Sequence, residues 1–281
     1  MQRLQAYLAG RSVEAAVGRL RPHIYLPFLA ILVCIGAIFA LVYWSALALD
    51  RYALLETRSQ LQYQADAVKR ESGRILLEYS WWNEAIEQTI YARSKAWSDE
   101  NLGVYLSDRY HLSAMVALGP HGEAAYRYAS PDTRLPDGWA KDNAIIGHLV
   151  DEALAGDPES PTPASSFAEI RGSLYVLAAA PFAAYEPSGR DLDRFHGVLV
   201  AARPISEREL AAWGEQYSVE AITVEPADEK RPDSPEHADV HLENVLGEAV
   251  PRIAWSPERP GLTFLGQVLP WSVGLVAVVG G

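Results

Sequence analysis

The sequence predicts an α+β protein flanked by two transmembrane helices, in which a long N-terminal helix packs on a mostly antiparallel sheet. Three observations lead to this prediction. Residues 23–49 and 261–281 contain no Asp, Glu, Lys or Arg. A polar and apolar stretch without proline follows the first of these runs, from residue 50 to about residue 92. Beyond it, short apolar runs alternate with turn residues and short helical patterns, as in an antiparallel sheet with inserted helices.

The two uncharged runs are each long enough to cross a bilayer, because about 20 apolar residues at about 1.5 Å per residue span its hydrocarbon core. The first run reaches Asp50 without a small-residue cleavage site. This favours a retained transmembrane helix over a secretory signal peptide. The second run reaches the last residue without a charge. We therefore expect residues 261–281 to form a second transmembrane helix, truncated at or near its far end.

The charges around the first run predict its orientation. The tail, residues 1–22, has a net charge of +3, which the positive-inside rule places in the cytoplasm. Because the whole chain carries −12 and both runs are uncharged, −15 remains for residues 50–260. We expect that acidic segment to be a periplasmic domain of a bacterial inner-membrane protein. Nucleic acid is not expected as a partner, because phosphates repel such a surface.

A long helix is predicted to continue from the first run to about Ala92. Along it, apolar and small residues recur in steps of four and three, the spacing of a helix that packs on another helix. We name these residues the seam: Leu61, Ala65, Val68, Ser72, Ile75, Tyr79, Trp82, Ile86 and Thr89. The spacing favours a homodimer in which the seams of two copies meet. The rival interpretation is that the seam packs only on its own sheet.

The remaining elements follow from turn and capping residues. Residues 97–112 predict a short helix that Ser98 caps, and residues 142–156 an amphipathic helix that ends at a glycine. Gly119-Pro120-His121-Gly122 indicates a hairpin between two short strands. Further strands are expected around a turn at Arg171-Gly172 and around residues 186–191. The last elements are a helix over 207–217, a strand over 219–226 and an acidic surface loop over 227–239.

The sequence lacks the motifs of common enzymes and metal sites. It contains no G-x-S-x-G turn, P-loop or G-x-G-x-x-G. His237 and His241 have the i, i+4 spacing of two metal ligands on a helix, but they follow a proline-rich loop and lack a third fixed ligand. The only cysteine, Cys34, lies in the first apolar run, so the exported domain has no disulfide. We expect no enzymatic activity, metal or cofactor in this chain.

Two stretches resemble the fourth type of CHASE domain: LLEYSWWNEAIEQTI, residues 76–90, and WSDENLGVYLSDRYHLSAMVALGPHGEAAYRY, residues 97–128. The resemblance covers about residues 50–203. It implies an extracytoplasmic sensory module between two transmembrane helices, with a PAS-like or Cache-like sheet. Family members typically have two acidic residues after the tryptophan, where this chain has Asn83 and Glu84. The resemblance also implies a cytoplasmic output domain missing here, often a GGDEF or EAL domain that makes or breaks cyclic di-GMP.

Five residues are candidates for binding a ligand: Trp81, Trp82, Asn83, Glu84 and Arg127. Trp82 lies in the seam, where filling the core is the simpler interpretation, while Trp81 points about 100° away. Trp81, Asn83 and Glu84 form either the rim of a pocket or a solvated face. Arg127 lies in a predicted strand on the face opposite its two tyrosine neighbours. There it holds either a ligand carboxylate or a surface ion pair.

The leading functional interpretation is a sensor of an unknown small molecule or periplasmic protein. In a sensor, ligand binding changes the packing of the sheet on the long helix and biases a two-state element. One alternative is a structural dimerisation module without a ligand, and a weaker one is an exported membrane-anchored hydrolase. A sensor should contain an enclosed pocket of ligand size, whereas a dimerisation module should be packed solid.

Overall fold

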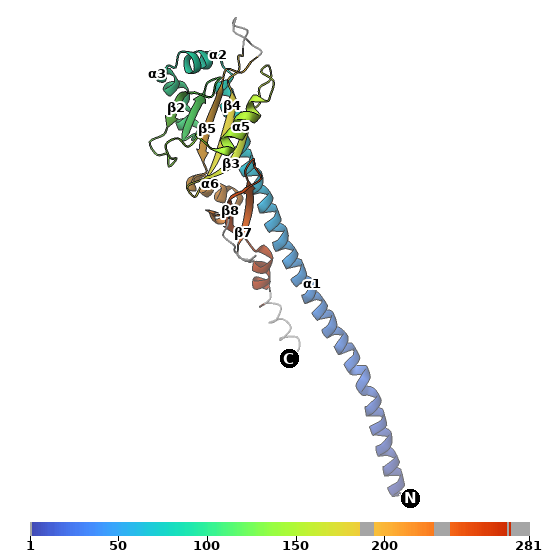
Figure 1. Cartoon of the computed structure of the whole chain (residues 1–281). Coiled ribbons are helices and arrows are strands. Elements are labelled where there is room, and N and C mark those ends of the chain that lie inside the picture. Colours follow the sequence, from blue (N-terminus) through green and yellow to red (C-terminus); the bar gives the residue numbers. More distant parts are fainter. Residues whose placement is uncertain (1, 186–193, 228–236, 269, 271–281) are drawn as a thin grey trace. The chain divides into compact units, whose positions relative to one another are not determined.

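The computed structural model describes residues 2–185, 194–227, 237–268 and 270 (Figure 1). The chain divides into two compact units, one of residues 1–55 with 258–281 and the other of residues 56–257. The helix α1 (Gln2–Ser80) runs without a break through the chain of both units. The predicted turn at 186–191 and most of the loop over 227–239 lie outside the described residues.

In the first unit, α1 is accompanied by a helix over residues 260–268. Among the described residues, one helical stretch, Leu29–Ser80, is long and apolar enough to cross a membrane, and it contains an 18-residue window with a mean hydropathy of 2.4. Most of the second predicted run, residues 269 and 271–281, lies outside the described residues. The two membrane spans therefore stay predictions based on composition.

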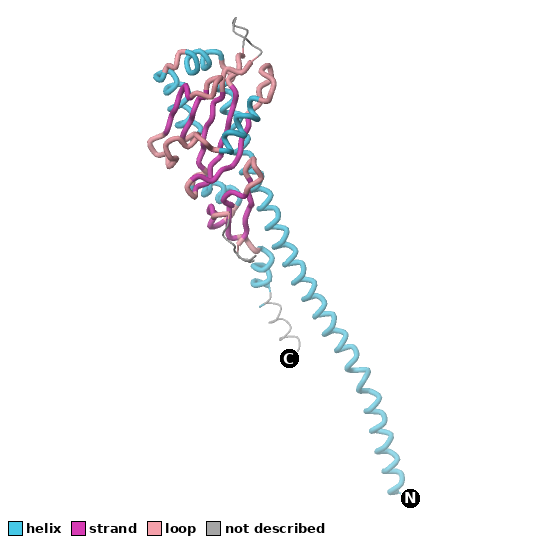
Figure 2. Tube along the Cα trace, viewed as in Figure 1, coloured by secondary structure: helices cyan, strands magenta, loops and turns pink. Residues whose placement is uncertain are grey.

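The second unit contains a five-stranded sheet in the order β2-β1-β5-β4-β3, with every neighbouring pair antiparallel (Figure 2). Its strands are β1 (Ala114–Leu118), β2 (Ala124–Ala129), β3 (Ala164–Ile170), β4 (Ser173–Pro181) and β5 (Val198–Pro204). The predicted hairpin at residues 119–122 is confirmed. So is the turn between β3 and β4, where Arg171 and Gly172 have φ of 54° and 76°. Two successive positive φ angles are typical of a two-residue hairpin turn.

A second, three-stranded antiparallel sheet has the order β6-β8-β7. Its strands are β6 (Glu220–Glu225), β7 (Ala238–Glu243) and β8 (Ala249–Ser256). The sequence predicted only β6. In β7 the buried Val240 and Leu242 alternate with the exposed His241. The segment is thus a strand, and the helical spacing considered for His237 and His241 does not exist.

Helices cover both faces of the five-stranded sheet (Figure 1). The helix α5 (Ala144–Leu154) begins at Asn143, whose side chain accepts the backbone N–H groups of two residues in the first turn. Successive side chains of β4 point to opposite faces of the sheet and so belong to two different hydrophobic cores. Ala178 shares one core with Leu76 of α1, and Leu177 shares the other with Leu149 of α5. Alanine on the α1 side lets the helix lie close to the sheet, because its methyl group takes little room.

The seam is buried within its own chain. Leu61 and Ala65 have no exposed surface, and Val68, Ser72 and Ile75 are at most 3% exposed. The rival interpretation is therefore correct for these residues, which are not available to a second copy in this structure. A homodimer through another face of α1 stays a proposal.

The long helix ends earlier than the seam spacing predicted. The N–H of Trp81 still donates to the carbonyl of Leu77 at 2.8 Å, but Trp82 is extended, with φ −150° and ψ 120°. The chain continues through short helices and two π-helical turns, which the spacing did not predict. They are α2 (Asn83–Ala85), η1 (Ile86–Tyr91), α3 (Lys95–Ser98), η2 (Asp99–Gly103) and α4 (Val104–Tyr110).

The predicted cap at Ser98 is wrong. The helix α3 begins at Lys95, after Ser94. Ser98 is buried, and its hydroxyl shares a hydrogen bond of 3.0 Å with Thr89 of η1. This hydrogen bond satisfies a buried hydroxyl and joins η1 to the end of α3.

The sheet is also tied to α1 by charge. The helix α6 (Glu207–Tyr217) begins as predicted, with the N–H of Glu209 donating to Ser206 Oγ at 3.2 Å. Arg203, at the end of β5, donates from Nη2 to Glu209 Oε1 at 2.7 Å. Its Nη1 lies 4.0 Å from Glu71 Oε2 of α1. The Arg203 side chain is only 12% exposed, so this guanidinium joins three elements in a partly dry environment.

Removing the Arg203 guanidinium should make stability depend on pH. Burial raises the pKa of Glu209 above its ordinary value, while Arg203 and His111 oppose that rise. Without the guanidinium the pKa rises further, and a carboxyl with a raised pKa loses stabilising free energy as pH rises through it. Arg203→Met should therefore lose more unfolding free energy relative to wild type at pH 8 than at pH 5.

The measurement is urea unfolding of the chain in detergent at both pH values, followed by tryptophan fluorescence. Arg203→Lys, which keeps a positive charge, serves as the matched control and should show the smaller pH dependence. An equal loss for Arg203→Met at both pH values would contradict a buried Glu209 carboxylate held by this arginine.

Candidate functional site

The break after Ser80 sends two adjacent indole rings in different directions. The ring of Trp82 packs against the core shared by α1 and the sheet, 5.1 Å from the ring of Trp97 and tilted by 48°. The sequence placed this ring in the core, and the structure confirms it, although the residue is extended and not helical. Trp82 thus packs between the end of α1 and α3.

Trp81 faces the chain that leaves β4. Its Nε1–H donates to the carbonyl of Ala184 at 3.4 Å, and its ring meets that of Tyr185 edge-on at 5.6 Å. Asn83 Oδ1 accepts the backbone N–H of Tyr185 at 2.7 Å. The side chains of Trp81 and Asn83 therefore both bind the segment that follows β4.

A hollow of about 410 Å³ opens beside this contact. It lies between the segment after α1 and the residues that end β4 and precede β5. Its lining residues are Asn83, Glu84, Ile86, Glu87, Gln88, Ala184 and His196. Two of the five predicted ligand residues, Asn83 and Glu84, are among them.

His196 forms the buried end of the hollow, with 1% of its surface exposed. Its Nδ1 and the hydroxyl of Tyr91 in η1 are 2.7 Å apart, a hydrogen bond whose direction depends on the imidazole tautomer. Backbone bonds of 2.8 Å to Phe182 hold the chain on both sides of the imidazole. Gly197 permits this path, because its φ is 141° and a Cβ there would lie 2.2 Å from the carbonyl oxygen of Leu118.

Five of the seven lining residues of the hollow have polar side chains. Glu84 and Glu87 supply carboxylates from α2 and η1, and Gln88 an amide. Ala184 and His196 line the hollow from the segment between β4 and β5. A π-helical turn such as η1 is rare and is frequently found at functional sites. Polar groups from two elements around a small hollow can hold a small polar molecule by several hydrogen bonds.

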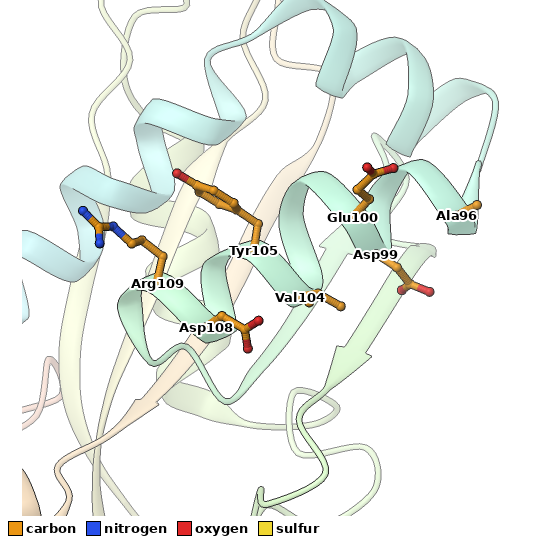
Figure 3. Close-up of a pocket in the computed structure, with 7 residues that line it drawn as sticks. All are labelled: Ala96, Asp99, Glu100, Val104, Tyr105, Asp108 and Arg109. Carbon is orange, nitrogen blue, oxygen red and sulfur yellow. The ribbon is translucent and has the colours of Figure 1, made fainter.

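A larger hollow, of about 750 Å³, lies along the outer side of α3, η2 and α4. All of its lining residues belong to this one helical stretch, residues 96–109, so they offer no opposing wall. Figure 3 shows Asp99 and Glu100 pointing to opposite sides of the helix. Carboxylates that diverge on one helix do not converge on a ligand, and we assign no site here.

Asp99 has a structural role instead. Tyr126 of β2 donates its hydroxyl hydrogen to Asp99 Oδ1 at 2.9 Å, and Lys95 pairs with the other carboxylate oxygen. The hydrogen bond from Lys95 lowers the pKa of Asp99 below its ordinary value. Burial raises the pKa of Tyr126, so the phenol stays a donor at neutral pH. Gly103 makes room for this contact, because a Cβ there would lie 2.1 Å from the Tyr126 hydroxyl.

Arg127 does not join the hollow. It is exposed on β2 at the edge of the sheet, while Tyr126 is buried and Tyr128 packs on the core of the opposite face. The predicted alternation is therefore correct, but Arg127 is not among the lining residues of either hollow described here.

Sequence reasoning missed five lining residues: Ile86, Glu87, Gln88, Ala184 and His196. A histidine directly before a glycine at the start of an apolar run was the one visible signal for His196. Its partner Tyr91 is 105 residues earlier, so nothing local connected the two.

Comparison with known proteins gives a family match. The family model of the CHASE4 domain matches residues 66–225, more than half of the chain. The comparison with curated proteins gave no match.

Several solved structures are similar. The periplasmic domain of LuxQ from Vibrio cholerae is 10% identical, with 73% of this chain and 99% of that chain covered and a TM-score of 0.46. A domain of a putative sensory box/GGDEF family protein from Vibrio parahaemolyticus is 11% identical, with 75% and 98% covered and a TM-score of 0.43. The ligand-binding domain of the Pseudomonas aeruginosa amino acid chemoreceptor PctC, in complex with GABA, is 11% identical, with 73% and 96% covered and a TM-score of 0.34.

The two tryptophans should differ in what they contribute to stability. Trp82→Ala removes a ring that packs against the core and against Trp97, and should cost about 3 kcal/mol of unfolding free energy. Trp81→Ala removes a half-buried ring and one long hydrogen bond, and should cost about 1 kcal/mol. Urea unfolding of both variants in detergent measures the difference. Equal and large losses would show that both rings are core residues, and Trp81 would then have no separate role beside the hollow.

Proposed function

The chain belongs to the CHASE4 domain family, and from that premise we propose that it is the extracytoplasmic sensory input region of a membrane-bound signalling protein. The observation that supports this most is the position of the hollow at the end of α1. Its rim includes Asn83, which follows α1 after two residues and binds the backbone of Tyr185. A molecule in the hollow would touch both the segment that ends α1 and the segment that leaves the sheet.

The proposed mechanism uses the continuity of α1. The helix has no break between its apolar segment and Ser80, so a displacement at its end is passed along the whole element. A ligand shifts the equilibrium only if it binds one arrangement more tightly than the other. Here that difference arises if the ligand bridges Glu84 or Gln88 to His196, which lie on opposite sides of the hollow.

The ligand is proposed to be a small polar metabolite. A hollow of about 410 Å³ suits such a molecule, because ligand sites commonly measure about 300–1,000 Å³. Asn83 and Glu84 are retained as proposed contacts, and Glu87, Gln88 and His196 are added. Trp82 and Arg127 are left out because neither lines the hollow.

The output that this input controls is proposed to lie on the cytoplasmic side. As the resemblance to the family implies, we propose a diguanylate cyclase, a cyclic di-GMP phosphodiesterase, or both. The alternative of a dimerisation module without a ligand requires solid packing between η1 and the sheet. The hollow is half open and is not the enclosed pocket expected of a sensor. The proposal therefore rests on the polar residues of the hollow and on its place at the end of α1.

A thermal-shift screen of the chain in detergent against small polar metabolites tests the proposal. Because binding to the folded state alone stabilises it, a true ligand at 100 times its Kd should raise Tm by about 5–10 °C. The variant Glu84→Gln should lose most of this shift. Glu100→Gln, an exposed carboxylate on the outer face of η2, is the matched control and should keep it.

Two results would count against the proposal. One is a screen in which no metabolite raises Tm. The other is a ligand whose shift survives in Glu84→Gln and Asn83→Ala but is lost in Glu100→Gln, which would move the site to the outer face of the short helices.

A further inference from the structure

Two helices of the first unit present matching faces. On α1, Ala46 is buried and Val42 and Asp50 are half-buried, in steps of four residues along one side of the helix. On the helix over residues 260–268, Gly261 and Leu265 are buried, also four residues apart. Steps of four form the ridges by which helices commonly pack.

The carboxylate of Asp50 ends this face of α1 and binds the start of the second helix. Its Oδ1 accepts the backbone N–H of Gly261 at 2.6 Å, and its Oδ2 that of Leu262 at 3.2 Å. The first N–H groups of a helix have no partner inside the helix, and a nearby negative charge also suits its dipole. Such a cap usually comes from the residue before the helix. Here it comes from another helix, 211 residues earlier.

Gly261 is needed for the close approach. A Cβ at this position would lie 2.0 Å from the carbonyl oxygen of Ala46, a contact with backbone that cannot move aside easily. Gly266, on the same helix, has no atom within 4 Å of its Cβ position. Glycine is therefore required at position 261 but not at position 266. Small residues allow helices to pack closely in membranes.

The contact lies where both apolar runs meet charged residues. Asp50 is the first charged residue after the run that includes 23–49, and Arg259 is the last one before the run that includes 261–281. A carboxylate at this boundary is near the interface, where leaving the N–H groups of a helix without partners costs more than in water.

We propose that Asp50, Ala46 and Gly261 form a latch that fastens the start of the second helix to α1 at the membrane boundary. The latch makes the two helices one body at this point. A shift of α1 then passes directly to the helix that leaves the domain, by a route that avoids both sheets. The existence of the latch rests on the contacts above, and its use in relaying a signal rests on the proposed function.

Hydrogen exchange of the full chain in lipid nanodiscs tests the latch. N–H groups in the first turn of a helix normally exchange fast, so protection at Gly261 and Leu262 is specific to the carboxylate. Asp50→Ala should speed exchange of both amides roughly 2- to 30-fold, the range expected for losing a cap. Asp50→Asn keeps one oxygen acceptor and should restore protection of only one of the two. Glu56→Ala, an exposed carboxylate of the same helix, is the control and should change neither.

A second pair of variants tests the close approach. Gly261→Ala should push the helices apart and speed exchange of both amides although Asp50 is present. Gly266→Ala should leave them protected. Unchanged protection in both Asp50→Ala and Gly261→Ala would overturn the latch, and so would fast exchange of both amides in wild type. No ligand is used, so this failure is distinct from failure of the sensor proposal, which the thermal-shift screen decides.

Discussion

The burial of one face of α1 by its own chain is the constraint on which the other features depend. From Leu61 to Leu76 the helix presents small and apolar residues that have almost no exposed surface. At the end of this stretch, Ile75 and Leu76 share a core with Ala117, Ala178 and Ala201 of β1, β4 and β5, whose small side chains take little room on the face that α1 covers. Burial of this extent fixes the rotation of the helix about its axis, since turning it would expose apolar surface to water.

The end of α1 creates the candidate site. If the helix continued to Ala92, Trp82 would stay in the seam and Asn83 would follow on the helix surface. Instead the extended Trp82 packs, partly buried, against the core, and Asn83 binds the backbone of Tyr185. The π-helical turn that follows places Tyr91 against His196. The hollow is therefore a consequence of how the helix is terminated against the end of β4.

Much of the fold could be predicted from the sequence because its signals are local. The hairpin at residues 119–122, the turn at Arg171-Gly172 and the helices α5 and α6 depend on a few adjacent residues. The end of α1 could not be predicted in this way. The steps of four and three continued through Trp82, Ile86 and Thr89, and a spacing rule cannot distinguish an α-helix from a break followed by a π-turn.

Contacts between residues that are far apart in the sequence also could not be predicted. The seam spacing identified the buried face correctly, but the same spacing suits a second helix or a sheet, and only the fold decides between them. His196 and Tyr91, or Asp50 and Gly261, are far apart in sequence, and each is ordinary in its own surroundings. The second sheet was missed because β7 follows an acidic, proline-bearing segment whose histidines were considered only on a helix.

The central claim is that α1 extends from the membrane into an exported domain that buries one face of this helix. It is tested most directly by labelling single cysteines along α1 in intact cells with a thiol reagent that does not cross the inner membrane, in a Cys34→Ser background. The account predicts labelling at exposed positions and protection at seam positions and at Ser12 in the N-terminal tail. The exposed set is Tyr63, Arg70 and Arg74, and the seam set is Ala65, Val68 and Ser72. Labelling without a helical period, or labelling at Ser12 in place of Tyr63, would contradict it.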